Sequence, residues 1–412
     1  MNDSKGKQMY RHLNNELRRE TDKARGQWLK EQCEEIELLE KRGRIDMMYA
    51  KVRELNETDH KKVVSQGIDT KSGDRLTDAS DIQRRWVEHI EELYDRDAKP
   101  DNIYIGSEEM VDQDDMGPPL LSSEIWKAVE EIRGKRACGI DDLPIELFKN
   151  LDGQMRKELE RLCVNIYETG DWPKDFLRTV MIPIPKKNNA TKCSDFRTIS
   201  LICHASKIIL KIITRRMVEK AESFLGWDQF GFRTGLGTRE AIAVMRTLCE
   251  RSLEVQKEVN ICFVDYEKAF DRVNWVKLLD VLKSLGVDWK DRRLIRNLYL
   301  GQTVSIRTAQ GDSEPGSIGR GVRQGCPLSP ILFNVYAEAM VQEAFIHMKD
   351  GIIVGGRTVN SVRFADDKAI VSHSEEGLQR LMDSLVTTGE DFGIRINITK
   401  TKVMKVTRSG GD

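Results

Sequence analysis

The 412-residue chain lacks several features that would assign a protein to a class at once. No stretch approaches the roughly 18 consecutive apolar residues that a membrane-spanning helix needs. The first residues, MNDSKGKQMYRHLNNELRRE, have no apolar core of the kind found in secretory signals. We therefore expect an intracellular protein without a membrane partner, and no signal favours nucleus over cytoplasm. The sequence gives no prediction of the oligomeric state.

The chain also lacks net charge and paired cysteines. Its formal charge is −1, which excludes a globally basic nucleic-acid binder but leaves a locally basic one open. Its eight cysteines are scattered without a C-x-x-C pair, so neither structural zinc nor a disulfide framework is expected. The Cys203-His204 neighbours are interpreted as ordinary packing. A reducing compartment fits this pattern.

Charge and turn residues divide the chain into four predicted segments. Residues 1–96 are dense in both charge signs and are predicted to form a charged helical linker segment. Residues 97–119, DAKPDNIYIGSEEMVDQDDMGPP, are acidic with Pro and Gly and are predicted to be an acidic linker. The composition then changes, and residues 120–165 and 166–412 are expected to hold the folded core.

A basic patch lies within that core, hidden by the balanced total charge. Between residues 186 and 220 the acidic residues are only Asp195 and Glu219. One interpretation is a solvated helix face, which is the usual fate of a charge run. The other is a surface that contacts nucleic acid. The basic residues of the patch are Lys186, Lys187, Lys192, Arg197, Lys207, Lys211, Arg215, Arg216 and Lys220.

Carboxylates occupy unusual places in two apolar stretches. VNICFVDYEKAFDRV contains a short β-favouring run that ends in Asp265, and SVRFADDKAIV carries Asp366 and Asp367 between two apolar runs. The second stretch predicts a hairpin with the aspartates at its tip. If the hairpin lies beside the first strand, three carboxylates converge, and hard divalent cations take such ligands. An isolated Asp-Asp pair, however, is usually an ordinary turn.

Several motifs in order resemble one family. FVDYEKAFDRV, GVRQGCPLSPILFNVYAE and FADD, with MIPIPKK, DFRTISLICHASKIILKIITRRM and QFGFRTGLGTREAIAVMR upstream and GIRINITKTKVM downstream, resemble the reverse transcriptase domain of non-LTR retrotransposons, over roughly residues 120–407. The resemblance implies an α+β right-hand polymerase with an antiparallel-sheet palm. Residues 120–165 would extend the fingers, and residues 166–412 would form the fingers and palm. The thumb is expected to be largely missing, and the upstream endonuclease domain absent.

The same resemblance implies the catalytic residues. Asp265 and Asp366 match the metal ligands of the family, and Asp367 completes the acidic triad. Two Mg²⁺ ions are the implied cofactor, with Mn²⁺ as an alternative. Such a pair of ions stabilises both the attacking and the leaving oxygen in phosphoryl transfer. Lys400, in NITKTK, matches a lysine that protonates the departing pyrophosphate.

The implied substrate-binding residues lie in the other motifs. Phe270, five residues after the first catalytic aspartate, matches the bulky side chain that blocks a ribose 2′-hydroxyl. Gln324 and Gly325 would contact the incoming nucleotide and the template. Arg197 matches the arginine that grips the triphosphate, because a guanidinium fork suits phosphate oxygens. The lysines that would assist it are Lys186 and Lys187.

The resemblance implies an RNA template, a DNA primer and dNTPs as partners, and three functions stay open. The first is an RNA-directed DNA polymerase domain of a mobile element that transfers dNTPs to a primer 3′-hydroxyl. The second is a catalytically inactive, nucleic-acid-binding remnant, expected if the missing thumb prevents synthesis. The third is an RNA-directed RNA polymerase, against which the bulky Phe270 argues.

Overall fold

The computed structural model describes residues 4–42, 44, 47–48, 51, 67–309 and 311–408, and the chain divides into two compact units, Met1–Ser65 and Gln66–Asp412. In the first unit, α1 (Ser4–Lys41) is one helix of 38 residues, as the charged, proline-free sequence predicts. The rest of the predicted helical segment up to residue 66 lies mostly outside the described residues. The predicted four-segment division stays a prediction.

The second unit begins with a small hairpin and a well-capped helix. The strands β1 (Ile68–Asp69) and β2 (Arg75–Leu76) pair antiparallel. Helix α3 (Ala79–Leu93) follows, with the Asp78 carboxylate accepting hydrogen bonds from the first-turn amides, as an N-cap does. Its buried face carries Trp86 and Ile90, so this charged stretch packs into the unit.

The acidic stretch after α3 is held along α12 (Trp289–Gly301). It contains η1 (Arg96–Ala98), η2 (Glu108–Met110) and α4 (Gln113–Met116). Arg293 forms a 3.3 Å ion pair with Glu108, and Arg296 Nε donates a 2.6 Å hydrogen bond to the Ile103 carbonyl.

The remaining helices of this unit are α5 (Ser122–Glu131), α6 (Ile145–Lys149), α7 (Gly153–Thr169), α8 (Lys174–Leu177), η3 (Cys193–Asp195), α9 (His204–Phe224), α10 (Thr238–Glu254), η4 (Ala269–Arg272), α11 (Trp275–Ser284), α13 (Ser329–Phe345) and α14 (Glu375–Asp391).

Two larger sheets organise this unit. One has the order β4-β3-β6-β7, with β8 also on β6; all its pairs are antiparallel except β3 with β6. The other has the order β11-β12-β5-β13 and is antiparallel throughout. The strands are β3 (Arg178–Pro185), β4 (Phe196–Leu201), β5 (Val259–Val264), β6 (Thr303–Thr308), β7 (Gly311–Asp312), β8 (Gly316–Ser317), β9 (Ile352–Val354), β10 (Arg357–Val359), β11 (Ser361–Phe364), β12 (Asp367–Ser372) and β13 (Lys402–Val406).

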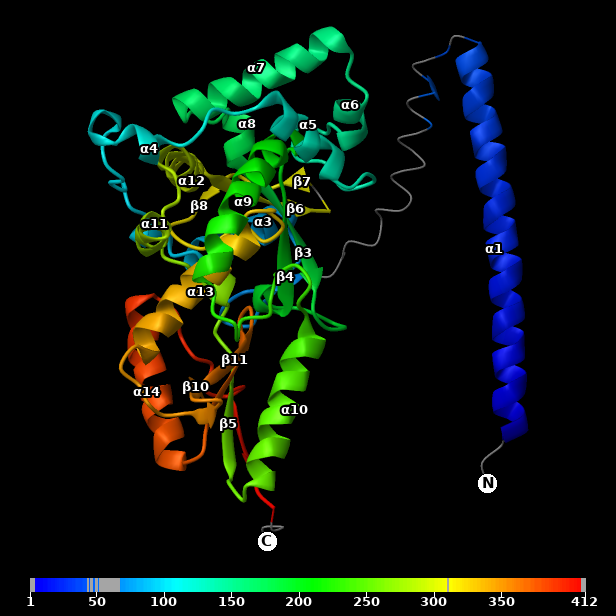
Figure 1. The fold of residues 1–412 in the computed structure, drawn as a ribbon. Helices are drawn as coiled ribbons and strands as arrows, with labels where there is room; N and C mark the ends of the chain where they lie inside the picture. Colours follow the sequence, from blue (N-terminus) through cyan, green and yellow to red (C-terminus); the bar gives the residue numbers. More distant parts are fainter. Residues whose placement is uncertain are drawn as a thin grey trace. The chain divides into compact units, whose positions relative to one another are not determined.

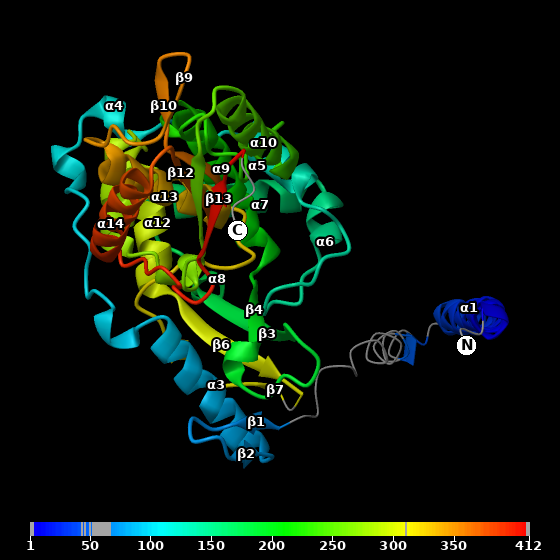
Figure 2. The ribbon, with the colours of Figure 1, turned by 90° about the horizontal axis from the view of Figure 1, so that it is seen from below.

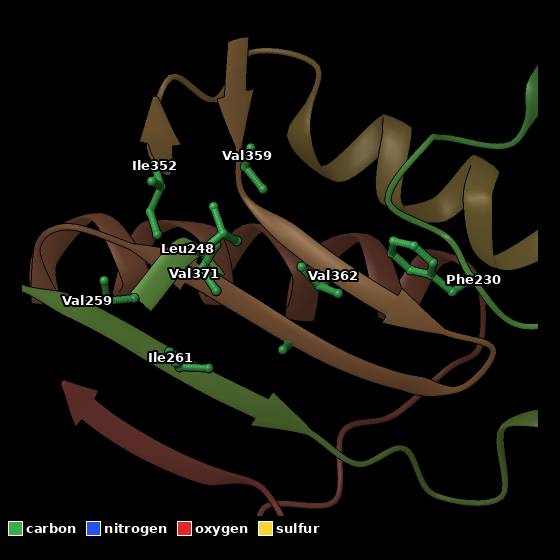
Figure 3. Packing of buried hydrophobic residues seen from close by; sticks show 9 residues of the cluster. Phe230, Leu248, Val259, Ile261, Ile352, Val359, Val362 and Val371 are labelled. Carbon is green, nitrogen blue, oxygen red and sulfur yellow. The ribbon is translucent and has the colours of Figure 1, made fainter. Parts of the chain in front are cut away.

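The four-stranded sheet has helices on both sides. Figures 1 and 2 show α10 on one side and α14 on the other. On the α10 side, Val259 and Ile261 of β5 pack with Val362, Val371 and Leu248, as Figure 3 shows. Both faces of β5 are therefore largely covered, and five of its six residues are buried.

The fold is thus a mixture of helices and sheets, which confirms the predicted fold class at that level. Helix α11 begins after Asn274, whose side chain accepts a hydrogen bond from the Lys277 amide, and Gly286 follows the end of the helix with a φ of +73°. Across the described residues, no helix is long and apolar enough to span a membrane. The seven cysteines whose side chains are described all carry free thiols.

A buried polar cluster joins α5, α7, α9 and α12. The Arg216 guanidinium donates two hydrogen bonds, of 2.9 and 2.7 Å, to the Glu124 carboxylate and a third, of 2.8 Å, to the Tyr167 hydroxyl. Asp291 lies beside this cluster with 1% of its surface exposed, and its Oδ1 accepts no hydrogen bond. Burial raises the pKa of Asp291 to about 6.

Replacement of Asp291 by Asn is expected to stabilise the fold above pH 7. The folded-state pKa lies above the usual value of about 4, so the folded protein binds this proton more tightly than the unfolded chain. Stability is therefore lost as the pH rises from about 4 to about 6. We expect Asp291→Asn to raise the free energy of unfolding by roughly 1–3 kcal/mol at pH 7.5.

Urea unfolding at pH 5.0, 6.0 and 7.5 checks this prediction, and the advantage of the variant should shrink as the pH falls. Asp280→Asn, at an exposed position of α11, is the control and should change stability by less than about 0.5 kcal/mol at every pH. Equal stabilities of wild type and Asp291→Asn at pH 7.5 would show that the buried carboxylate carries no penalty.

Candidate active site

The sheet register brings the predicted carboxylates to one end of adjacent strands. In the β11–β12 hairpin, Phe364 lies opposite Asp367, and Ala365 and Asp366 form the turn. β12 in turn pairs with β5, with Lys368 opposite Val264. Asp265 directly follows that last pair, so it lies at the same end of the sheet as the hairpin tip. The predicted hairpin beside the Asp265 strand is confirmed.

The hairpin turn is fixed from outside by residues 229–231. Ala365 has a φ of +57°, which is unfavourable for a residue with a Cβ. Its amide donates a 3.0 Å hydrogen bond to Oε1 of the buried Gln229, and the Gly231 amide donates to the same oxygen at 2.8 Å. A Cβ on Gly231 would lie 2.4 Å from the Ala365 nitrogen, so only glycine allows this approach. The turn that carries Asp366 is therefore held in one conformation.

Asp265 has one carboxylate oxygen without a hydrogen-bond donor. Its side chain is 37% exposed, but Oδ1 is buried and accepts no hydrogen bond. The nearest cation is Lys400, whose Nζ lies 3.6 Å from Oδ1, too far for a hydrogen bond. The Asn397 amide donates a 2.7 Å bond to the Asp265 carbonyl, which brings the loop with Lys400 to the site. A buried carboxylate oxygen that accepts no hydrogen bond is a site for a cation.

Asp366, in the hairpin turn, lies close to two other acidic side chains. Burial raises the pKa of Asp366, and the neighbouring charges of Asp367 and Asp265 raise it further. Asp367 is exposed at the start of β12. In the described part of the chain, no three Asp, Glu, His or Cys side chains form a metal-binding group. The donor set that fits a divalent cation is therefore the pair Asp265 and Asp366, since hard ions prefer carboxylate oxygens.

Beneath these carboxylates lies a buried lysine. The Lys368 Nζ donates a 3.1 Å hydrogen bond to the Tyr266 hydroxyl, and each residue directly follows an aspartate of the site. Burial lowers the pKa of Lys368 to about 7, and the positive charge of Arg363 adds to the effect. The residues behind the carboxylates are thus packed into the sheet, which fixes where the aspartates point.

A cavity of about 1260 Å³ opens at this end of the sheet, and both Asp265 and Asp366 line it. The volume exceeds the roughly 300–1,000 Å³ of a typical small-molecule site. Apart from these two carboxylates and Glu131 and Asp271, the ionised side chains around it are cationic. They are Arg133, Arg136, Lys186, Arg197, Lys207, Lys211, Lys268 and Lys400.

The structure divides the predicted basic patch into two parts. Lys186, Arg197, Lys207 and Lys211 line the cavity, and of these Lys211 already forms a 2.9 Å ion pair with Glu131. Three others join elements of the fold: Arg216 pairs with Glu124, Lys220 with Asp288 at 2.7 Å, and Arg215 with Glu131 at 3.2 Å. The structure thus separates the basic residues of the cavity wall from those paired within the fold, and contact with nucleic acid stays a prediction.

The two adjacent lysines have different surroundings. Lys186 lines the cavity, and its Nζ donates a 3.0 Å hydrogen bond to the Ser194 carbonyl. Lys187 forms a 2.9 Å ion pair with Asp195 and does not line the cavity. Arg197, exposed on β4, lines the cavity as well. The geometry therefore favours Lys186 over Lys187 as the lysine that would bind phosphate together with Arg197.

Gln324 and Gly325 lie against the end of β4. The Ser200 amide donates a 2.8 Å hydrogen bond to the Gln324 carbonyl. Gly325 has a φ of +108°, and a Cβ there would lie 2.8 Å from the Ser200 carbonyl oxygen. The segment that close packing at Gly325 brings near is therefore the backbone of β4. The Gln324 side chain donates a 2.9 Å hydrogen bond to Asp271.

Asp271 and Tyr94 are site residues that the sequence reasoning missed. The Tyr94 hydroxyl donates a second 2.9 Å hydrogen bond to the same oxygen of Asp271, and burial raises the pKa of this carboxyl. A buried carboxylate with two donors holds the Gln324 amide in place. Asp271 stands in the AFDRV sequence, where an acid in an apolar stretch was the available signal. Tyr94, which is 177 residues away, offered none.

Replacement of Tyr94 by Phe is expected to destabilise the fold. The change removes one of the two donors to the buried Asp271 carboxylate and leaves its charge partly unsatisfied. Loss of such a bond costs about 1–3 kcal/mol. Urea denaturation measures the effect, and Tyr104→Phe is the matched control because Tyr104 is 79% exposed. Equal losses in the two variants would show that the Tyr94 hydrogen bond contributes nothing specific.

Comparison with known proteins decides the family. The model of the family described as reverse transcriptase (RNA-dependent DNA polymerase) matches residues 184–409, more than half of the chain. The chain belongs to this family. The matched segment contains every site residue predicted from the sequence, from Lys186 to Lys400.

The relatives of this reverse transcriptase domain are proteins of mobile elements without long terminal repeats, as the resemblance predicted. The Pol polyprotein of the type-1 retrotransposable element R2 of Nasonia vitripennis is 24% identical over 292 residues, covering 71% of this chain and 28% of the relative. The RNA-directed DNA polymerase of the mobile element jockey of Drosophila funebris is 25% identical over 286 residues, covering 68% and 31%. The chain thus spans roughly a quarter to a third of the length of these relatives.

Solved structures include more distant similarities. The structure of apo telomerase from Candida tropicalis, truncated from its C-terminal domain, aligns with a TM-score of 0.46 at 15% identity. The alignment covers 63% of this chain and 56% of the telomerase chain.

Proposed function

We propose that the chain is an RNA-directed DNA polymerase domain of a mobile element, which adds dNTPs to a primer 3′-hydroxyl. The observation that carries the proposal is the placement of Asp265 and Asp366 at the end of paired strands, in the wall of a mostly cationic cavity. The carboxylates suit divalent ions, and the cations suit the phosphates of a nucleotide and a nucleic-acid strand. Membership of the family supports the same activity.

In this proposal the two sheets have different roles. The sheet β11-β12-β5-β13 is the palm, and the sheet around β3 and β4, with its flanking helices, belongs to the fingers. Residues 120–165 extend the fingers, and residues 166–412 form the fingers and palm. Residues 1–96 and 97–119 precede them in the chain, and the stretch from Gln66 onward belongs to the same compact unit. The cavity lies where residues of both sheets meet, since Arg197 comes from β4 and Asp366 from the β11–β12 hairpin.

The residues present fit a divalent cation, because Asp265 has an unsatisfied buried oxygen and Asp366 lies in the same cavity wall. We assign Asp265 and Asp366 as ligands, with Asp367 as the third acid, for two Mg²⁺ ions or Mn²⁺ in their place. Such ions, when bound, promote ionisation of the attacking hydroxyl and offset the charge of the leaving pyrophosphate.

The remaining site residues bind and orient the substrates. Arg197 and Lys186 face the triphosphate, and Lys400, close to Asp265, donates a proton to the departing pyrophosphate. Phe270, in the cavity wall, excludes a ribose 2′-hydroxyl by its bulk. Gln324, held by Asp271, contacts the incoming nucleotide. Catalysis then depends on positioning and on charge stabilisation, as expected for phosphoryl transfer.

Primer extension by the purified chain tests the proposal. A DNA primer on an RNA template is incubated with dNTPs and Mg²⁺, and we expect extension that EDTA abolishes and added Mg²⁺ restores. RNA binding with a steep salt dependence but no incorporation would instead identify a non-catalytic nucleic-acid-binding remnant. Preferred incorporation of ribonucleotides would indicate an RNA-directed RNA polymerase and contradict the assigned role of Phe270.

A further inference from the structure

The ring of Phe270 contacts two other aromatic rings. Phe333 of α13 stacks on it, with ring centroids 4.2 Å apart and planes inclined by 16°. Phe232 meets it edge-on, at 6.3 Å and 88°. Both are favourable aromatic geometries. The three rings come from separate parts of the chain: the loop before α10, η4 and α13.

Phe232 is an unusual residue in two respects. Its side chain is 54% exposed and lines the same cavity as Asp265 and Asp366. Its backbone has a φ of +57°, in the left-handed region that bulky residues rarely occupy. Neither a large exposed ring nor this backbone conformation favours folding. Strained backbone of this kind persists where the surrounding structure enforces it, which is often near a functional site.

Hydrogen bonds on both sides of Phe232 enforce its conformation. The buried Asn334 side chain donates a 2.7 Å hydrogen bond to the Gly231 carbonyl. The Arg233 Nη1 donates to the carbonyls of Gly226 and Gln229, at 2.8 and 2.9 Å. Asn334 directly follows Phe333 in α13. The two rings that flank Phe270 therefore come from segments that are bonded to each other.

We propose that Phe232 and Phe333 form an aromatic clamp that fixes the Phe270 ring, so that Phe232 helps to set the preference for deoxynucleotides over ribonucleotides. A side chain excludes a 2′-hydroxyl by its bulk only if it cannot rotate away when the larger sugar enters. Phe333 stacks on a face of the Phe270 ring, and Phe232 meets the ring edge-on, so rotation of Phe270 would break both contacts. Phe232 is thus a positioning residue. This inference rests on the proposed function, and in particular on the assigned role of Phe270.

The test compares dATP with ATP opposite a template uridine. We expect Phe232→Leu to lower the ratio of kcat/KM for dATP to that for ATP by roughly 3- to 10-fold, the range that corresponds to one aromatic contact. Leucine keeps a Cβ on the same strained backbone, so the substitution removes the ring contact alone. Phe232→Tyr keeps the ring and should keep the ratio.

Two further variants make the test specific. Trp227→Leu, which removes another exposed aromatic (51%) that lies five residues earlier and outside this cavity, should leave the ratio unchanged. Phe270→Ala should lower the ratio more than Phe232→Leu does. Calorimetry on the primer–template complex also gives the dissociation constants for dATP and ATP. Their ratio tests the clamp even without turnover.

The outcomes separate the clamp from the proposed function. Equal losses for dATP and ATP in Phe232→Leu would overturn the clamp, because a merely structural role affects both nucleotides alike. An unchanged ratio in Phe232→Leu with a lowered ratio in Phe270→Ala would overturn the clamp and leave the role of Phe270 intact. An unchanged ratio in Phe270→Ala would overturn both. Discrimination in binding that depends on Phe232, without any incorporation, would support the clamp and contradict the polymerase activity.

Discussion

Replacement of Asp366 by Asn is expected to reduce primer extension by roughly 10³-fold or more, since the removed charge contributes several kcal/mol to transition-state stabilisation. Asn has the size of Asp but is uncharged. The conformation of the turn does not depend on this side chain, because Gln229 and Gly231 hold the neighbouring Ala365. The variant should therefore fold normally and still bind RNA, so that loss of extension reports on the carboxylate.

Asp265→Asn should have an effect of similar size, because Asp265 lines the same cavity as Asp366. The control is Asp391→Asn, at the exposed end of α14, which should extend primers at the wild-type rate. Initial rates of dNTP incorporation, with circular dichroism to verify folding, make the comparison. Wild-type rates in Asp366→Asn would show that the assigned ligand set is wrong.

Replacement of Arg363 by Leu is expected to destabilise the fold by about 3–5 kcal/mol, because it leaves buried carboxylates without a partner. Arg363 is buried in β11, where its guanidinium donates hydrogen bonds of 3.0 Å to Asp228 and 2.9 Å to Glu338. Both acids are themselves buried. The arginine lies two residues before the turn that carries Asp366, so the hairpin should loosen as well.

Urea unfolding at pH 7.5 measures this loss. Arg357→Leu, at an exposed position of the neighbouring β10, is the control and should change stability by less than about 0.5 kcal/mol. Arg363→Leu combined with Asp228→Asn and Glu338→Gln should regain much of the stability, because the uncompensated charges are then gone. A small effect of Arg363→Leu alone would indicate that water or another cation reaches the carboxylates.

Much of the β11–β12 hairpin was predictable from the sequence. The run from Ser361 to Phe364 and the run after Asp367 are short, apolar and separated by polar residues, which is the local signature of a hairpin. A strand that ends in Asp265 follows from the same kind of pattern. Because the family motifs occur in order, they also identified the ten predicted site residues. The structure places eight of these ten in the wall of one cavity: Lys186, Arg197, Asp265, Phe270, Gln324, Gly325, Asp366 and Lys400.

Other features were not predictable from local patterns. Lys186 and Lys187 are neighbours of the same type, and only their surroundings distinguish the lysine in the cavity wall from the one paired with Asp195. The residues of the predicted basic patch likewise fall into two groups: some line the cavity, and others form ion pairs between elements of the fold. Nothing in the stretch around Tyr94 indicates its hydrogen bond to Asp271.

The amino-acid sequence by itself determined the strands, the hairpin and the identity of the acids at their ends, because strand period and turn preference depend on near neighbours in the chain. Only the tertiary structure decided which cations reach the cavity, how Asp271 holds Gln324, and that Phe232 and Phe333 flank Phe270. These contacts join residues far apart in the chain, and the packing of whole helices and sheets sets their distances.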